Sequence, residues 1–473
     1  MESIQRKYDV IIVGAGPAGV FAALELAQAT DLKILLLEKG KDLPFRKCPI
    51  IGKELSCPPC SPCGLVSGWG GAGAFSDGKL TLSPHVGGQL ESYLGVEKTA
   101  DLVRYVDDIY VKFGASNGVY GTGPEVDKLA RRAQAAGLRL IPTPIRHMGT
   151  ETCREVLKDM RHFLSSRIES QTDTEATSVI VQEGVVKGVE TSDGRQIGAR
   201  FVIVAPGREG ADWLLKEAAR LGITLHNNPV DIGVRVELPF KVLQALTDVF
   251  YELKLEFRSP TFDDRIRTFC MCPAGEVTME TTGGHDPVIT VNGHSYSHRK
   301  TDNTNFALLV SASFSPPFRE PIAYGRYVAR LANIISGGVI VQKMGDLTTG
   351  HRSTSVSIEE GVVQPTLKSA TPGDLGYVLP YRFFMGIIEM LAAMDRLVPG
   401  VASPDTLLYG VEVKFYSSRL ELTESLETET ANVFAVGDGA GVSRGLIQAS
   451  ASGVVAAREI VRRVSQSALL RRR

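Results

Sequence analysis

The sequence lacks a charge imbalance, a long apolar run and internal repeats, and each absence excludes a class of protein. Its 52 basic and 53 acidic residues give a formal net charge of −1, so no basic field indicates a nucleic-acid partner. Glycines interrupt the apolar stretch near the start, which Asp9 and Glu25 bound, so a membrane span is not expected. The start is also not typical of a secretory signal peptide. We therefore expect a cytoplasmic protein that binds neither membranes nor nucleic acid.

Cysteine is also scarce, with seven in 473 residues. In a long cytoplasmic chain, cysteines favour metal or redox chemistry over a disulfide framework. Apolar residues make up 43% and charged residues 22% of the chain, which is typical of a globular protein. The length predicts two or three domains.

The most informative stretch is Tyr8–Gly40, which has the pattern of a strand, a glycine-rich turn, a helix and a second strand. The apolar run Val10–Val13 predicts a buried strand, and a helix is expected over Val20–Ala29. The turn between them is a G-x-G-x-x-G of Gly14, Gly16 and Gly19. These glycines allow a tight turn, close approach of a pyrophosphate and close helix packing, with the helix N-terminus facing the phosphates.

Glu38 follows the second expected strand, Lys33–Leu37. A carboxylate at this position binds both ribose hydroxyls of an adenosine and disfavours a 2′-phosphate. The stretch therefore predicts a site for FAD or NAD rather than NADP. The alternative is an ordinary strand–helix–strand unit whose glycines only form a turn.

The rest of the chain alternates between strand and helix patterns. Ser178–Val181, Val185–Glu190 and Arg195–Ile197 predict a meander, and a further strand is expected over Phe201–Val204, before Ala205-Pro206-Gly207. Residues 227–379 are strand-rich and contain no second G-x-G-x-x-G. The chain closes with a strand ending in Gly437-Asp438 and a helix over Leu446–Val464.

These separated pieces together resemble the FAD domain of the glutathione-reductase-like flavoproteins, which is assembled discontinuously from the chain. The resemblance implies that Asp438 binds the ribityl chain and a nearby phosphate. It also implies that the last helix directs its N-terminus at the flavin pyrimidine, where it would stabilise negative charge on the reduced flavin. The alternative for Gly437-Asp438 is an ordinary surface turn.

Several longer motifs narrow the resemblance to the bacterial family of FAD-dependent dehydrogenases, also described as NAD(P)/FAD-dependent oxidoreductases, which has no well-defined substrate. The motifs are GWGGAGAFSDGKL (68–80), PVDIGVRVE (229–237), RTFCMCPAGEV (267–277), LLYGVEVKFYSSR (407–419) and GDGAGVSRGLIQASASGVVAARE (437–459). Aromatic hydroxylases, flavin halogenases and pyridine-nucleotide disulfide reductases fit less well, because their further motifs are absent. The reducing equivalents are then expected from the substrate, from transiently bound NAD(P)H or from a partner.

The resemblance implies an α/β fold in which a strand-rich substrate domain interrupts a Rossmann-like FAD domain. The expected bounds are 1–225 for the first part of the FAD domain, with a Cys- and Gly-rich loop at 46–80, then 226–400 for the substrate domain and 401–473 for the closing part. The residues expected to contact FAD are Gly14, Gly16, Pro17, Ala18, Gly19, Glu38, Lys39, Gly71, Gly73, Ser76, Lys79, Ala176, Ala205, Gly207, Gly437, Asp438, Gly445, Leu446 and Ile447.

The cysteine-rich loop is the most unusual feature of the sequence. Cys57, Cys60 and Cys63 have the C-x2-C-x2-C spacing of iron–sulfur loops, and Cys48 precedes a proline upstream. Four thiolates could instead hold a structural zinc ion. A disulfide and plain reduced thiols are the other two interpretations that the spacing leaves open.

Candidate catalytic residues are fewer and less specific. Lys79 could stabilise an anionic flavin or bind an acidic substrate, although a surface lysine is as common. Cys270 and Cys272 lie in an expected strand that could line the substrate cavity, but buried apolar cysteines are the commoner outcome. His147 could be a general acid, although most such histidines are structural.

The sequence is compatible with three functions. The first is a dehydrogenase or reductase that passes a hydride between flavin N5 and a small organic substrate. The second is an FAD-dependent monooxygenase. The third is an electron-transfer or redox module that uses the cysteine loop and an electron-carrier protein. The sequence leaves the oligomeric state undetermined.

Overall fold

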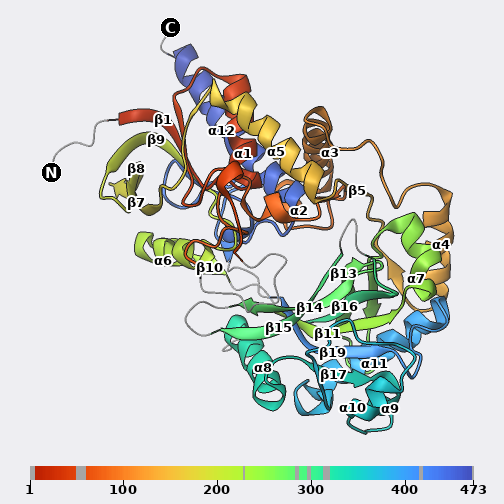
Figure 1. Ribbon diagram of the computed structural model, residues 1–473. Coiled ribbons are helices and arrows are strands. Elements are labelled where there is room, and N and C mark those ends of the chain that lie inside the picture. The colour runs from red at the N-terminus through yellow and green to blue at the C-terminus, as the bar shows by residue number, and fades with distance from the viewer. Residues whose placement is uncertain are drawn as a thin grey trace. The chain divides into compact units, whose positions relative to one another are not determined.

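The computed structural model describes residues 6–49, 60–226, 230–282, 287–295, 300–312, 320–414 and 419–470. The chain forms two compact units (Figure 1). Unit 1 consists of residues 1–118, 146–226 and 417–473, and unit 2 consists of residues 119–145 and 227–416. The predicted α/β class is confirmed. No helix among the described residues is both long enough and apolar enough to cross a membrane.

The bounds of the units correct the expected ones at two places. Residues 119–145 and 401–416 were assigned to the FAD domain, but they belong to unit 2. The reason is long-range strand pairing within that unit. Strand β4 (Arg139–Leu140) pairs with β12 (Leu255–Arg258), and β19 (Leu407–Lys414) pairs with β11 (Val230–Pro239).

Unit 1 is built on a seven-stranded sheet within the described part of the chain. Its order is β6-β2-β1-β9-β8-β7, and β21 also pairs with β9. The strands β6, β2, β1, β9 and β21 are parallel to their neighbours, whereas β7, β8 and β9 form an antiparallel meander. The strands are β1 (Arg6–Val13), β2 (Ile34–Leu37), β6 (Glu169–Gln171), β7 (Ala176–Gln182), β8 (Val185–Thr191), β9 (Gln196–Val204) and β21 (Val433–Ala435).

One strand replaces two expected ones. Arg195–Ile197 and Phe201–Val204 were predicted as separate strands, but they form the continuous β9. The amino end of β9 pairs with β8, and its carboxyl end pairs with β1 and β21. Because different strands flank the two ends of β9, the pattern of apolar and polar side chains changes along the strand. In the sequence, this change looks like a gap between two separate strands.

Helices and short strands complete unit 1. The helices are α1 (Pro17–Ala29), α2 (Leu90–Leu94), α3 (Val96–Lys112), α5 (Thr150–Ser165), α6 (Ala211–Leu221) and α12 (Leu446–Leu470), with 3₁₀ turns η1 (Leu43–Phe45), η2 (Gly71–Phe75) and η4 (Asp438–Ala440). The short strands are β3 (Lys79–Thr81), β10 (Leu225–His226) and β20 (Arg419–Leu420), and the chain returns from unit 2 through β5 (Ile145–His147).

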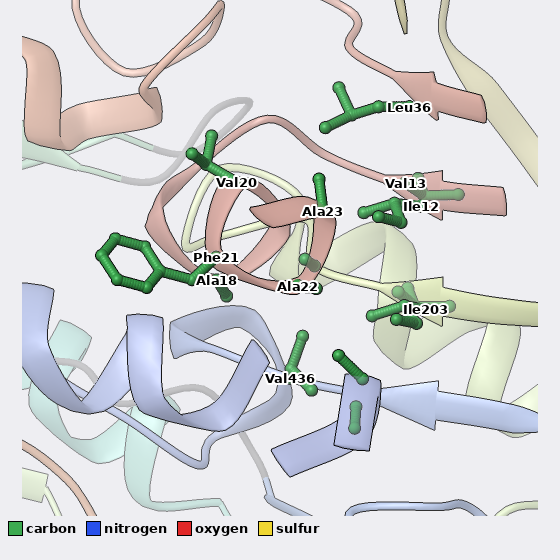
Figure 2. Close-up of a cluster of buried hydrophobic side chains, with 14 of the residues drawn as sticks. Ile12, Val13, Ala18, Val20, Phe21, Ala22, Ala23, Leu36, Ile203 and Val436 are labelled. Carbon is green, nitrogen blue, oxygen red and sulfur yellow. The ribbon is translucent and has the colours of Figure 1, made fainter. Parts of the chain in front are cut away.

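The core of unit 1 surrounds α1. Figure 2 shows Val20, Phe21, Ala22 and Ala23 of this helix together with side chains of β1, β2 and β9 and with Val436. Nearly every residue of α1 from Ala18 to Leu26 is buried, because α12 covers the helix on another side. This enclosure explains why α1 is apolar around most of its circumference rather than along one stripe.

Among its described residues, unit 2 contains an eight-stranded sheet in the order β18-β17-β19-β11-β16-β13-β12-β4. Its pairs are antiparallel except β17 with β18. A hairpin of β14 (Glu276–Thr282) and β15 (Val288–His294) packs against it. The remaining strands are β13 (Arg265–Cys272), β16 (Asn303–Ala312), β17 (Ile340–Lys343) and β18 (Thr371–Pro372). The helices are α4 (Pro124–Ala135), α7 (Phe240–Phe250), α8 (Pro321–Ser336), α9 (Met344–Thr348), α10 (Ser355–Glu359) and α11 (Tyr381–Leu397), with the turn η3 (Leu375–Tyr377).

The contact between α1 and α12 yields a test of the fold. A Cβ atom at Gly453 would lie 2.0 Å from the carbonyl oxygen of Ala18, so no side chain fits between these helices. We expect Gly453→Ala to lower the free energy of unfolding by about 1–3 kcal/mol, the usual cost of overpacking a core. Urea unfolding measures this loss. Gly118→Ala is the control, because a Cβ at Gly118 has no neighbour within 4 Å, and equal stability of both variants would contradict the packing argument.

Candidate functional site

Four segments meet at one edge of the unit 1 sheet. Val13 pairs with Leu37 and with Val204, and Val204 pairs with Ala435, so the carboxyl ends of β1, β2, β9 and β21 lie in one row. Gly14, Glu38 and Ala205 directly follow three of these strand ends, and Gly437 lies two residues after the fourth. In open parallel sheets, ligands bind beyond the carboxyl ends of the strands. The edge therefore brings together the motifs that lie far apart in the sequence.

The glycine turn after β1 has two tightly packed positions and one open position. A Cβ at Gly14, where φ is +104°, would lie 2.2 Å from the Ala205 carbonyl oxygen, and one at Gly19 would lie 1.9 Å from the Gly14 oxygen. A Cβ at Gly16 would have no neighbour within 4 Å. No side chain caps α1, which begins at Pro17, among the described residues. The open Gly16 and the uncapped N–H groups suit a pyrophosphate.

Glu38 lies beside this turn and is almost fully buried. Its carboxylate accepts hydrogen bonds from the backbone N–H groups of Ala15, Gly40 and Gly68, each at 2.8 Å. A carboxylate has about four acceptor positions, so one remains for a hydroxyl group. The residue thus fits a ribose and also holds three backbone segments together, which the sequence did not indicate.

The predicted glycine loop lies against the same turn. A Cβ at Gly71 would be 2.9 Å from the Cα atom of Gly16, and one at Gly73 would be 3.4 Å from Pro17 and 3.0 Å from Leu446. The Ser76 hydroxyl donates to the Gly73 carbonyl oxygen at 3.0 Å and accepts from the Gly78 N–H group at 3.2 Å. The loop, the first turn and the start of α12 are therefore neighbours.

Asp438 lies at the carboxyl end of β21. It accepts a hydrogen bond from the Ser443 hydroxyl at 2.6 Å, and the Arg208 guanidinium is 3.6 Å away. Burial raises the pKa of Asp438, and Arg208 opposes the shift. A Cβ at Gly439 would lie 2.4 Å from the Gly207 carbonyl oxygen, so the turns after β9 and β21 are packed together.

Arg46 is a residue of this region that sequence reasoning missed. Its buried guanidinium donates to four backbone carbonyl oxygens, those of Gly64 (3.1 Å), Leu65 (2.8 Å), Trp69 (2.6 Å) and Gly71 (2.8 Å). Burial lowers its pKa to about 10, although Glu38 acts against the shift. Arg46 therefore connects the cysteine-rich segment to the glycine loop. Nothing in the sequence distinguishes it from a surface arginine.

A second missed residue is Gln448 in the first turn of α12. Its amide donates to the carbonyl oxygens of Pro84 (2.9 Å) and Val86 (3.1 Å), and its oxygen accepts from the Leu90 N–H group at 3.3 Å. Gln448 is buried and holds the start of α12 against the 84–90 segment. A glutamine in an otherwise apolar turn was the only signal for it.

The contacts of the other candidate residues in unit 1 do not indicate a particular role. The Lys79 ammonium lies 3.2 Å from Asp77, and that of Lys39 lies 3.9 Å from Glu209. His147 ends β5, and its backbone carbonyl oxygen accepts from Ser116 at 3.2 Å. Ala176 begins β7, and Gly445, Leu446 and Ile447 form the start of α12.

The proposed metal ligands are only partly described. Cys48, Cys60 and Cys63 are free thiols, whereas Cys57 lies outside the described residues. In the parts of the chain that the structure covers, no three His, Cys, Asp or Glu side chains are grouped to hold a metal ion. The metal or cluster interpretation stays a prediction.

Cys270 and Cys272 lie in β13 of unit 2, where a strand was expected. Neither forms a disulfide bond within the described residues, and the Cys272 thiol is buried with its sulfur 3.6 Å from the Cys270 carbonyl oxygen. The register with β16 shifts between Phe269 and Cys272, and Cys270 has a φ of +45°. Non-glycine residues in this region of backbone conformation are uncommon and often lie near functional sites.

Each unit contains a segment that matches a known protein family. Residues 229–415 match the family described as FAD-dependent protein, C-terminal domain-like, and residues 8–56 match pyridine nucleotide-disulphide oxidoreductase. An uncharacterized protein from Clostridium beijerinckii is 27% identical over 479 residues, which cover 95% of this chain and 80% of the relative.

Among solved structures, glycine oxidase from Geobacillus kaustophilus is 14% identical, with 97% of this chain and 95% of that chain covered and a TM-score of 0.37. L-proline dehydrogenase from P. horikoshii is 12% identical, with 97% and 94% covered and a TM-score of 0.39.

The family matches, together with the edge formed by Gly16, Glu38, Gly71 and Asp438, define the protein as an oxidoreductase with FAD as its cofactor. Glu38 would hold the adenosine ribose, the N-terminus of α1 the pyrophosphate, and Asp438 the ribityl chain. Bound FAD supplies the redox chemistry, and the chain supplies binding, orientation and electrostatics.

The open position at Gly16 tests the cofactor site. In Gly16→Val, the new side chain fills the space left for the pyrophosphate, so FAD affinity should fall at least about tenfold, a loss of roughly 1.4 kcal/mol. Flavin fluorescence titration of the apoprotein measures the dissociation constant. Gly118→Val is the control, because Gly118 also has open surroundings but lies away from the motif. Unchanged FAD binding by Gly16→Val would place the cofactor elsewhere.

Arg46 provides a separate test of the glycine loop. Arg46→Met leaves four carbonyl oxygens without their donor, so the loop should lose its fixed position and FAD affinity should fall about tenfold or more. The matched control is Arg154→Met. The Arg154 guanidinium lies 5.2 Å from the Phe75 ring, and that of Arg46 lies 4.9 Å from it. A larger loss of affinity in Arg154→Met than in Arg46→Met would show that ring stacking, not the carbonyl contacts, positions the loop.

Proposed function

We propose that the protein is a dehydrogenase or reductase of the bacterial FAD-dependent dehydrogenase type, and that a hydride passes between a small organic substrate and flavin N5. In this proposal unit 1 binds the cofactor and unit 2 holds the substrate. The observation that carries it is the division of the two kinds of site, with a dinucleotide edge in unit 1 and, in unit 2, a charged sheet face whose Arg267 and Lys414 are partly exposed.

The chain's own residues have definite tasks in this proposal. The Gly16 and Gly71 segments bring backbone against the cofactor, and Arg46 holds the second of these segments in place. Asp438 and the start of α12 are expected to orient the flavin end. A helix N-terminus there favours negative charge, which develops on the ring when it accepts a hydride.

The charged sheet face of unit 2 supports the assignment of the substrate to that unit. Arg235 and Glu412 are both completely buried and form a bidentate ion pair, with distances of 2.8 and 2.9 Å. Burial opposes the charge on Arg235, but Glu412 holds the pKa of this guanidinium above its usual range. Apolar residues of similar volume often stabilise a protein as much as a buried ion pair does. Stability alone therefore does not explain this pair. Lys414, whose ammonium lies 3.1 Å from Glu412, extends this charged network to a side chain that is 15% exposed and that a polar ligand can reach.

The proposed reaction is tested by reducing the flavin anaerobically. We expect one class of organic substrate, or NADH or NADPH, to bleach the flavin absorbance in rapid mixing, with no oxygen atom from O₂ in the product after aerobic turnover. The control is the Gly16→Val variant mixed with the same compounds, in which bleaching should decrease in proportion to its lower FAD content.

Other outcomes of this experiment would indicate other functions. Incorporation of ¹⁸O from labelled O₂ would make the protein a monooxygenase. Reduction only by a protein electron carrier would make it an electron-transfer module. Replacing Cys57, Cys60 and Cys63 together by serine separates this last function from the first, because a simple dehydrogenase retains flavin reduction by its substrate.

A further inference from the structure

The sheet of unit 2 is apolar on one face and charged on the other. In β11, Ile232, Val234 and Val236 belong to the apolar core that includes residues of α7 and α11. The alternating residues Asp231, Arg235 and Glu237 are also buried. Successive side chains of a strand point to opposite faces, so these charged groups share the other face. Burying charge is costly unless it is paired, and this face is therefore built around charge pairs.

The deepest part of this face is a closed network. Arg235 donates to Glu412, to Asn305 at 2.7 Å and to the Cys270 carbonyl oxygen at 3.1 Å. A Cβ at Gly293 of the covering hairpin would lie 2.1 Å from the Arg235 guanidinium, so no side chain fits there. The hairpin thus covers Arg235, and a ligand has no space to reach it.

A more accessible part of the same unit lies around Phe269. Three cations surround its ring: the Lys254 ammonium at 5.0 Å, the Arg267 guanidinium at 5.1 Å and the Lys414 ammonium at 5.9 Å from the ring centre. They come from the residue before β12, from β13 and from β19, so the sheet gathers them from separate parts of the chain. We call Lys254, Arg267 and Lys414 with Phe269 the cation cluster.

Each cation of the cluster has a carboxylate partner that is more buried than itself. The side chains of Glu252, Asp231 and Glu412 are 7%, 2% and 0% exposed, whereas those of Lys254, Arg267 and Lys414 are 12%, 21% and 15% exposed. The accessible charges are therefore mainly positive. Glu280, 3.9 Å from Lys414 and 42% exposed, is the acidic group at the rim.

Neutralising the buried carboxylates does not by itself explain the cluster. That task requires one cation near each carboxylate, but it does not require three cations from separate strands to share one aromatic ring. Their position around one ring offers several donors to a single anion. Lysine and arginine both bind carboxylates with charge-assisted hydrogen bonds, and arginine can do so through two parallel bonds.

We propose that Lys254, Arg267 and Lys414 around Phe269 bind the carboxylate group of the substrate, which is therefore a small organic acid. The inference rests on the proposed function in assuming that the ligand is the enzyme's substrate. The cluster binds the acid in its ionised form and fixes one end of it. Phe269 excludes water from one side of the cations, which strengthens their attraction to the carboxylate.

Equilibrium binding to the FAD-loaded, full-length protein tests the proposal without any turnover. Acetate, benzoate and succinate are titrated by calorimetry, each beside its uncharged amide. We expect at least one acid to bind, its amide to bind at least about tenfold more weakly, and added salt to weaken the acid. Absence of binding by all three acids at millimolar concentration, or equal binding of acid and amide, would overturn the proposal.

Substitutions locate the site. Lys414→Gln and Arg267→Gln should each weaken acid binding about tenfold or more, whereas Lys414→Arg should largely retain it. Arg258→Gln is the matched control, because this exposed arginine also pairs with an aspartate, Asp263, but is not one of the cations at Phe269. Equal acid binding by the wild type and by both glutamine variants would overturn the proposal.

A folding defect in the glutamine variants is distinguished by thermal unfolding and FAD content. If Arg267→Gln unfolds, Phe269→Leu leaves every charge in place and should still weaken acid binding. The experiments distinguish failure of the anion site from failure of the proposed dehydrogenase function. Acid binding that depends on the cluster, without anaerobic flavin reduction by any organic acid, would retain the anion site and reject the dehydrogenase.

Discussion

The carboxylate of Glu38 is the group on which the architecture of unit 1 depends. It accepts N–H groups from the glycine turn after β1, from the segment after β2 and from the loop before η2. Few side chains can satisfy three backbone donors at once, and a buried carboxylate is tolerated only when it is bonded in this way. Arg46 has the equivalent task with the opposite charge: its guanidinium donates to four backbone carbonyl oxygens of the adjoining loop. An irregular stretch rich in glycine thus acquires a defined shape from two side chains of opposite charge.

Sequence reasoning succeeded where the signal was local. The strand, glycine turn and helix of residues 10–29 have short periodicities that regular structure imposes, and Glu38 stands at a fixed distance from them. It failed where the cause was remote. The assignment of residues 119–145 to the first unit was wrong because β4 pairs with β12, more than a hundred residues away, and pairing across such a distance leaves no local pattern. Arg46 could not be found because carbonyl groups of an irregular backbone have no sequence signature. The cation cluster was missed because Lys254, Arg267 and Lys414 become neighbours only through the strand order.

The two units use polar groups differently. In unit 1, Glu38, Arg46 and Gln448 bind mainly backbone groups, which every residue type provides. In unit 2, Arg235, Glu412 and Lys414 bind mainly other side chains, so each contact depends on the identity of both partners. A site for a common cofactor needs a reliable shape, whereas a site for a particular substrate needs a particular arrangement of charge. In the proposed function, the contacts of these six residues divide along this line.

The position of β21 and α12 at the end of the chain has a consequence for synthesis on the ribosome. Strand β9 receives its parallel neighbour β21, and α1 its cover α12, only from residues after 432. Until these residues emerge, the apolar surface of α1 and one edge of β9 lack their partners, although residues 6–204 already contain most of the sheet. Domains generally fold as units and in order of synthesis, and exposed apolar surface or a free strand edge favours aggregation. The nascent first unit therefore stays incomplete while residues 227–416 of the second unit are translated, and chaperones can act during that interval.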